Sequence, residues 1–268
     1  MSDVRITATM HGASNVARLL SRHPEKIGRT LESLVKQEAR GMAVELARHT
    51  RPFGFGESAK ARGEKAVRAD IHRVYKPPAE AYEQMKKVDP ALADRFWAAV
   101  TNRRFVKANK VMQDSSSPMH GVSMGRLDPS LHKSARTGPH ANVPRRTKPS
   151  QIVTSQTAID SYAKKKLRMV GFAKASWINC AKAIGGRVRG AAQWATRHKK
   201  APGTATVKTG ANPSVTLINS LWYIDQVCPV SSVEMALKSA SERLRKALAH
   251  SMAAIANRTN AALRRRAG

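Results

Sequence analysis

The sequence predicts an α+β fold in which long amphipathic helices pack on a small antiparallel sheet and an extended basic arm leaves the core. Three observations lead to this prediction. Apolar residues recur at helical spacing along two long stretches, one near each end of the chain. Short segments of alternating apolar and polar residues, typical of half-buried strands, stand beside them. A Pro-, Gly- and Ser-rich stretch without periodicity separates the two halves.

Residues 1–113 are expected to form the N-terminal strand and the helical part of the core. The longest periodic stretch carries apolar residues from Ile27 to Leu46 and predicts a helix of about 26 residues that ends before Arg51. Asp89 is expected to cap the helix that follows it. In order, we expect a strand over 4–10, a short helix over 14–20, the long helix, a short helix over 57–69, a strand over 71–75, and helices over 79–88 and 90–112.

Residues 114–157 are expected to form an extended basic arm rich in Pro, Gly and Ser. An aperiodic loop of this length is unusual inside a compact domain, so the stretch is either a functional arm or a disordered segment. Nearly all of its charges are positive.

Residues 158–268 are expected to complete the core. A helix over about 158–184 ends at Gly185-Gly186, and a basic loop around Trp194 follows it. The alternating residues 214–218 and 221–224 predict a hairpin that turns at Asn219-Ser220. Apolar residues from Val233 to Ala262 predict a terminal helix of about 30 residues.

The net charge is strongly positive, since 48 basic and 18 acidic residues give 48 − 18 = +30. Such an excess draws a chain toward polyanions and is not what an enzyme for a small neutral metabolite needs. Residues 115–224 hold 18 basic and 2 acidic residues, or +16, so they are the part expected to face a polyanion.

Basic clusters are the candidate nucleic-acid-facing sites, because a phosphate contact needs only a cation within reach. Those on the predicted helix are equally compatible with a solvated helix face. Trp194 lies between two clusters and either stacks on a base or, as we prefer, anchors the loop. The candidates are Arg145, Arg146, Lys148, Lys164, Lys165, Lys166, Arg187, Arg189, Arg197, Lys199 and Lys200.

No catalytic motif is found, and we expect neither an enzyme, a metal site nor a cofactor. Phosphate-binding loops, nucleophile elbows and zinc-protease motifs do not occur. The histidines are scattered, and His120, His132 and His140 are interpreted as solvated loop residues. Cys180 and Cys228 are expected to be reduced, packed thiols. Neither a signal segment nor a membrane span is expected, because the longest uncharged run is short, polar and interrupted by a proline.

The arrangement of segments is more informative than any motif. A strand and a long helix ending "ELARHTRPFGFG" come first, and "MGRLDPSLHKSAR" lies in the arm. "SVTLINSLWYIDQV" then precedes the terminal helix. This order resembles the neck or tail-completion proteins of tailed bacteriophages, of the minor tail protein Z type. The resemblance covers roughly residues 3–55 and 205–260.

The resemblance implies a virion structural protein, assembled in the host cytoplasm, that joins tail to head. It implies a homo-oligomeric ring, usually a hexamer, that contacts neighbouring connector and tail-terminator or tail-tube proteins. Genomic DNA would pass through the ring and be met by nonspecific contacts, without any membrane. The alternative is a sequence-nonspecific nucleic-acid-binding protein. A third hypothesis is a nuclease, for which Asp94 and Asp160 are candidate acidic residues.

Overall fold

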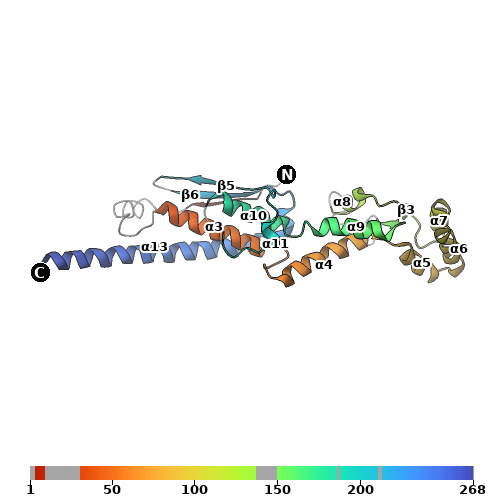
Figure 1. Ribbon diagram of the computed structural model, residues 1–268, viewed down its shortest axis with the longest axis horizontal. Coiled ribbons are helices and arrows are strands. Elements are labelled where there is room, and N and C mark those ends of the chain that lie inside the picture. The colour runs from red at the N-terminus through yellow and green to blue at the C-terminus, as the bar shows by residue number, and fades with distance from the viewer. Residues whose placement is uncertain (1–3, 10–30, 137–149, 186–187, 211–212, 268) are drawn as a thin grey trace. The chain divides into compact units, whose positions relative to one another are not determined.

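The chain folds as two compact units. Unit 1 comprises residues 1–63 and 170–268, and unit 2 comprises residues 64–169. The computed structural model describes residues 4–9, 31–136, 150–185, 188–210 and 213–267 (Figure 1). It is 64% helical with small sheets, so the predicted α+β class is confirmed.

A three-stranded antiparallel sheet forms one layer of unit 1. Its strand order is β1 (Val4–Thr9), β6 (Ser214–Asn219) and β5 (Gly203–Lys208). Val4 lies opposite Asn219 across the first pair, and Gly203 lies opposite Asn219 across the second. Alternate residues of the central strand, Val215, Leu217 and Asn219, are buried because they face the helices. The predicted N-terminal strand is confirmed.

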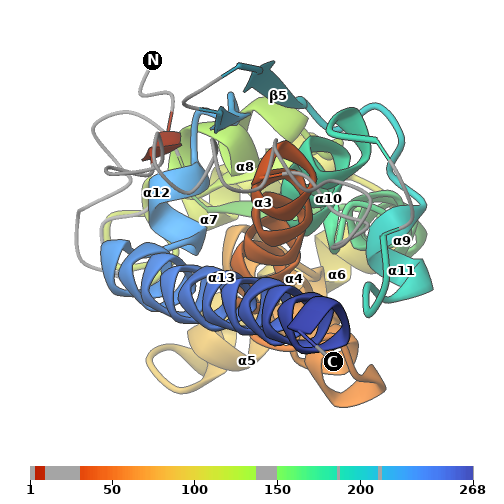
Figure 2. The same cartoon turned by 90° about the vertical axis from the view of Figure 1, so that its left-hand side faces the viewer.

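Two further layers of unit 1 are helical (Figures 1 and 2). α3 (Leu31–His49) and α10 (Phe172–Ala183) pack against each other and on the sheet. α13 (Val230–Ala267) packs on α3, which therefore lies between the sheet and α13. Both long helices predicted from periodicity are present, and the predicted start of the first one, like the helix predicted over 14–20, lies outside the described residues.

Gly171 breaks the single helix predicted over 158–184. The chain there forms α9 (Gln156–Leu167) and α10, and Gly171 between them has a φ of 94°. A positive φ is outside the helical region and is open to glycine at little cost. Ser155 caps α9 by accepting a hydrogen bond from the backbone N–H of Ala158 at 3.3 Å.

The hairpin predicted between residues 214–218 and 221–224 is wrong, because the first strand has a different partner. β6 pairs with β5, and residues 221–224 form a turn that leads into the short α12 (Ile224–Val227). Leu221 and Ile224 are buried while Trp222 between them is half exposed, a spacing that suits a turn and not a strand. α11 (Gln193–Thr196) lies in the predicted loop before β5.

A three-stranded sheet organises unit 2. Its order is β2 (Tyr75–Lys76), β4 (Gln151–Val153) and β3 (Ser123–Gly125), with both pairs parallel. Neighbouring residues of β4 point to opposite sides. Ile152 joins a core with Phe96 and Met112, and Val153 joins another with Ile71 and Tyr75. The helices that supply these cores are α4 (Glu57–Val74, which begins in unit 1), α5 (Pro78–Lys86), α6 (Pro90–Thr101), α7 (Phe105–Met112), α8 (Pro129–Arg136) and α9.

Three predictions for this part of the chain differ from the structure. The strand predicted over 71–75 is mostly helix, because Ile71, Val74 and Tyr75 are buried at helical spacing. The helix predicted over 90–112 is broken by a turn at 102–104 into α6 and α7. Residues 114–136 are not an extended arm, since they contain β3 and α8 and bury Met119 and Ala135.

Two smaller expectations are also settled. The Asp89 cap is confirmed, since its carboxylate accepts a hydrogen bond from Leu92 N–H at 2.9 Å. Both cysteines are free and buried, as predicted. Within the described ranges, no helix combines the length and apolarity that crossing a membrane requires.

Candidate nucleic-acid interface

Seven of the eleven cations predicted to face nucleic acid lie among the described residues. Arg145, Arg146, Lys148 and Arg187 lie outside the described residues. The other seven divide between the two units, with Lys164, Lys165 and Lys166 in unit 2 and Arg189, Arg197, Lys199 and Lys200 in unit 1. Each group is therefore considered within its own unit.

Lys164, Lys165 and Lys166 occupy the last turn of α9, where the negative end of the helix dipole favours cations. Lys164 and Lys165 are exposed. The Lys166 ammonium lies 5.2 Å from the centroid of the Tyr162 ring, a cation–π contact within the same helix. Two of the three cations are thus presented to solvent and the third is partly engaged.

The cations of unit 1 lie in the segment around α11. Arg189, Lys199 and Lys200 are exposed. Arg197 is used internally, because its Nη2 donates to the Val170 carbonyl at 3.4 Å and its Nε to His198 Nε2 at 3.3 Å. Burial, followed by the positive charge of Arg197, lowers the pKa of His198. The His198 ring packs edge to face against Phe172.

Trp194 is an anchor of the fold. Its side chain is 7% exposed, and its indole Nε1 donates a hydrogen bond to the Phe55 carbonyl at 2.9 Å. A buried indole with a satisfied N–H has no face for a nucleic-acid base. The preferred interpretation of Trp194 as a packed residue is confirmed, and the base-stacking alternative is wrong.

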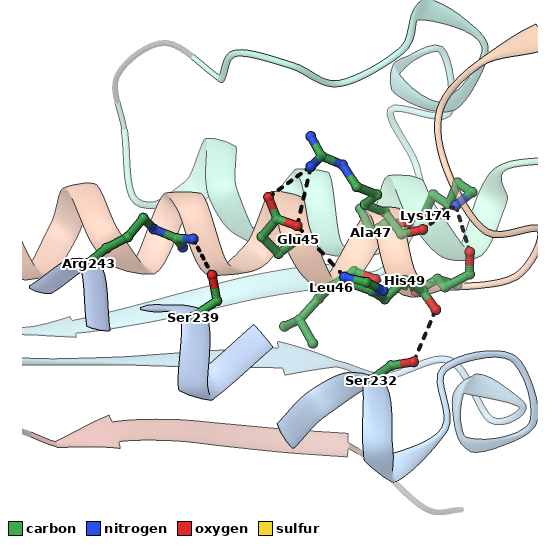
Figure 3. Close-up of polar contacts among 10 residues, drawn as sticks. Glu45, Leu46, Ala47, His49, Lys174, Ser232, Ser239 and Arg243 are labelled. Atoms are coloured by element: carbon green, nitrogen blue, oxygen red, sulfur yellow. Dashed lines mark hydrogen bonds and ion pairs between the residues drawn. The ribbon is translucent and has the colours of Figure 1, made fainter. Parts of the chain in front are cut away.

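Lys174 is a buried cation that sequence reasoning missed (Figure 3). It sits in α10, fully inaccessible, and its Nζ donates to the carbonyls of Ala47 at 2.8 Å and Thr50 at 2.6 Å, with Arg48 at 3.4 Å. These carbonyls end α3, so the lysine caps a helix from a different segment of chain. Its ammonium also lies 5.2 Å from the Phe55 ring centroid. Burial lowers the pKa of Lys174 to about 7.

Arg243 makes the corresponding link between α13 and α3. Its Nε lies 2.9 Å from a Glu38 carboxylate oxygen. Its Nη1 donates to Ser239 Oγ at 2.7 Å, as Figure 3 shows. The guanidinium passes over Gly41 of α3, where an added Cβ would stand 3.3 Å from Nη2. Ser232 at the start of α13 donates to the His49 carbonyl at 3.4 Å. Polar contacts therefore join α13 to α3 at two places, at Glu38 and at His49, the last residue of α3.

His132 belongs to a buried polar network in unit 2, so its interpretation as a solvated loop residue is wrong. Its Nδ1 lies 3.0 Å from the Tyr162 hydroxyl, and its Nε2 lies 2.9 Å from a carboxylate oxygen of Asp70. The rings of Tyr75 and Tyr162 meet edge to face at 5.5 Å, and the Tyr75 hydroxyl donates to the Asp128 carbonyl at 2.6 Å. Burial, followed by the nearby Tyr162, raises the pKa of Tyr75.

This network has the form of a base held by a carboxylate and facing a hydroxyl. The His132 side chain is nevertheless enclosed, with 4% of its surface exposed, and both ring nitrogens are occupied within the protein. Its clear effect is to join α4, α8 and α9. The acidic residues named for a nuclease are apart from it: Asp94 accepts from Tyr82 at 3.3 Å and Asp160 from Gln156 at 3.1 Å. The described chain contains no group of three metal-ligating side chains.

Comparison of the chain with protein-family models, curated proteins and solved structures found no match.

Proposed function

We propose that this chain is a structural protein of a tailed-phage virion, a subunit of the ring that joins tail to head and surrounds the path of the DNA. The observation that carries the proposal is the order of elements in unit 1. A first strand is followed by a long helix, an antiparallel strand pair and a terminal helix. This is the order that the resemblance to neck and tail-completion proteins implies.

The two stretches that the resemblance covers, residues 3–55 and 205–260, both belong to unit 1. The segment "MGRLDPSLHKSAR" lies apart from them in unit 2, which residues 64–169 form. A compact unit that is inserted in the sequence between the two halves of another unit can leave the fold of that other unit intact. The extra length of the chain is therefore compatible with the proposed architecture.

The face of the unit 1 sheet that the described helices leave uncovered gives the subunit contact. α3 and α10 pack on one face, while Thr204, Thr206 and Lys208 of β5 are exposed on the other. β5 is also an edge strand within the described sheet. An exposed edge is a template for pairing with another chain, and a heterologous contact that closes gives a ring. The neighbouring subunit is accordingly a second copy of this chain.

In this role the protein has no turnover, and its other partners are connector and tail-terminator or tail-tube proteins of the virion. DNA is met through its phosphates. Exposed cations that have no partner among the described residues, such as Lys164, Lys165, Lys199 and Lys200, supply contacts that do not depend on base sequence.

The test is the assembly state of the full chain. We expect closed rings in negative-stain images, and for a hexamer a particle mass near 6 × 29.3 kDa, or about 176 kDa, by mass photometry. Samples are measured with and without a short DNA duplex, because a net charge of +30 opposes assembly by self-repulsion. A chain that stays monomeric under both conditions and forms no closed particle overturns the proposal.

A matched pair of variants locates the contact. Thr206→Arg adds a long cation to the uncovered face of β5 and is expected to raise the concentration needed for assembly at least tenfold. Thr101→Arg makes the same change at an exposed position of unit 2 and is expected to leave it unchanged. If both variants form rings at the same concentration, this face is excluded as the subunit contact, but the proposal of a ring still stands.

A further inference from the structure

Unit 2 presents two helices joined by a tight turn. α6 ends at Thr101, α7 begins at Phe105, and the three residues between them make the turn. The two helices pack closely, and Phe96 of α6 and Ala108 of α7 are fully buried in the same core. Two helices and a three-residue turn form a compact motif that nucleic-acid-binding proteins often use.

Four cations lie at this turn and along the second helix. Arg103 and Arg104 occupy the turn, and Lys107 and Lys110 follow at spacings of three and six residues from Arg104. All four are exposed, and none has a side-chain partner among the described residues. We call this set, Arg103, Arg104, Lys107 and Lys110, the α6–α7 corner.

The corner has no acidic residue among its cations. Residues 95–113 contain five basic residues and no Asp or Glu, and residues 161–224 likewise contain basic residues and no Asp or Glu. On α4, in contrast, cations pair with carboxylates one turn away, as Lys60 does with Glu57 and Arg73 with Asp70, both at 3.4 Å. Charges without such pairs keep their full attraction for an external anion.

The backbone fixes where the corner arginines stand. Arg103 has a φ of 56°, and it is the one non-glycine residue with a positive φ in the described part of the chain. A bulky side chain in this conformation costs free energy and persists where the surrounding structure imposes it. Asn102 secures the same turn, since its Nδ2 donates to the Ala98 carbonyl at 2.8 Å.

The second helix is held equally firmly. Asn109 Oδ1 accepts a hydrogen bond from Met124 N–H at 3.0 Å, which ties α7 to β3. Gln113 donates to the Val122 carbonyl at 2.8 Å and accepts from Gly121 N–H at 3.1 Å. A surface held in place before binding loses little conformational freedom when a partner arrives. The corner is thus a rigid display of cations.

We infer that the α6–α7 corner binds the phosphate backbone of duplex DNA. α7 has eight residues and is about 12 Å long. Duplex DNA carries one negative charge per about 1.7 Å of its axis, so a surface of this length lies against several phosphates at once. An anionic membrane is a poorer partner, because a helix that lies in a membrane needs a broad apolar face and α7 buries Ala108 and Met112 in its own core. The inference deepens the DNA-contact part of the proposed function and does not depend on ring formation.

The test measures binding of the full chain to a mixed-sequence duplex of 30 base pairs by fluorescence anisotropy, over a range of salt concentrations. The corner variant carries Arg103→Asn, Arg104→Gln, Lys107→Gln and Lys110→Gln, with Asn chosen because it tolerates a positive φ. The control variant carries Lys65→Gln, Arg68→Gln, Lys87→Gln and Lys182→Gln. Both variants lose four positive charges and change only exposed side chains.

We expect the corner variant to lose at least tenfold in affinity at 0.15 M salt and the control less than threefold. The slope of log K against log salt should become shallower by about 3.6 in the corner variant, since each of the four lost phosphate contacts removes about 0.9 and 4 × 0.9 = 3.6. Equal losses in the two variants, or no loss in the corner variant, overturn the inference. Unchanged circular dichroism and melting temperature confirm that both variants are folded.

Two further probes separate the alternatives. Polyglutamate stands for an acidic protein surface, and vesicles of anionic phospholipid stand for a membrane. A loss of polyglutamate or vesicle binding as large as the loss of duplex binding overturns the assignment to DNA. Because binding is measured on chains of any assembly state, DNA binding without rings contradicts only the ring, and rings without DNA binding contradict only this inference.

Discussion

Cations serve opposite purposes at two sites of the molecule, one in each unit. In unit 1, Lys174 is enclosed by carbonyls and aromatic rings, and Arg243 is paired with Glu38. In unit 2, the α6–α7 corner holds four cations that touch no partner within the described chain. The excess of positive charge is therefore a sum of two populations, one that holds helices together and one that is available to an external anion.

This difference shows that the partners of a cation, and not the number of cations in its stretch of sequence, decide whether it is available to an external anion. The charge density of residues 115–224 made them the expected polyanion-facing part, yet Lys174 and Arg197 within them serve the fold. The corner lies outside that stretch, within residues 1–114, whose 22 basic and 13 acidic residues give a net charge of only 22 − 13 = +9.

The largest effect is expected from Lys174→Met. Removing the ammonium leaves the carbonyls of Ala47 and Thr50 buried without a donor, which should lower the free energy of unfolding by about 3 kcal/mol. Amide hydrogen exchange should become faster in α3 and α10. The control is Lys182→Met, which changes an exposed lysine of the same helix. Equal stability of the two variants would show that Lys174 does not hold the helices together.

His132→Leu should have the next largest effect, confined to unit 2. The substitution leaves the buried hydroxyl of Tyr162 and the Asp70 carboxylate with one hydrogen bond fewer each, at a cost of about 2 kcal/mol. Exchange should increase in α8 and α9 while α3 and α10 keep their protection. His120→Leu, at an exposed position, is the control. Increased exchange throughout unit 1 would contradict the independence of the two units.

The pH dependence of stability should single out Lys174. Its pKa is about 7 when folded, against an ordinary value of 10.5, so between these values the unfolded chain binds one more proton. Stability should therefore rise with pH, by at most about 1.4 kcal/mol per pH unit. Burial raises the pKa of the Cys228 thiol, which opposes the trend above pH 9. Denaturant unfolding between pH 7 and 8.5 should show the rise, and Lys174→Met should flatten it.

Asp89→Ala should cost less, about 1 kcal/mol, because it removes one helix cap from an otherwise packed helix. Faster exchange is expected at the first turn of α6. Glu83→Ala changes an exposed carboxylate on the preceding helix and should leave this turn as it is. If Asp89→Ala also weakens DNA binding, the placement of α6 contributes to the corner.

The smallest change in stability is expected from the corner variant itself. Exposed cations without partners should be removable within about 0.5 kcal/mol of the original stability, as measured by denaturant unfolding. Arg103→Asn is expected to be neutral, or slightly stabilising, because Asn adopts a positive φ more readily than Arg. A fall of more than about 2 kcal/mol in the free energy of unfolding would show that these cations stabilise the fold.

Local patterns predicted the long elements and failed at their breaks. The periodicity of α3 and α13 and the alternation of β1 and β6 were sufficient, since each follows from neighbouring residues. The break at Gly171 and the pairing of β5 with β6 depend on contacts between distant segments. An added Cβ at Gly203, for instance, would stand 1.7 Å from the Ser176 carbonyl oxygen of α10, and no local pattern carries that information.

The candidate site was predicted less well than the fold, for a related reason. A cluster such as Lys164 to Lys166 is visible in the sequence, but whether a cation is enclosed depends on other elements. Lys174 has neighbours of ordinary composition, and its role comes from the end of α3, 124 residues away from it at Thr50. The corner had a local signal, Arg103-Arg104 after Asn102, which a single helix over 90–112 obscured.

The division of unit 1 into two stretches of sequence has a consequence for synthesis on the ribosome. Val4 of β1 pairs opposite Asn219 of β6, and these positions are 219 − 4 = 215 residues apart. At about 5–20 residues per second, the first strand waits roughly 10–40 s for its partner. Unit 2, continuous in sequence, is complete before then. The nascent chain therefore carries a complete unit 2 while unit 1 is still only half synthesised.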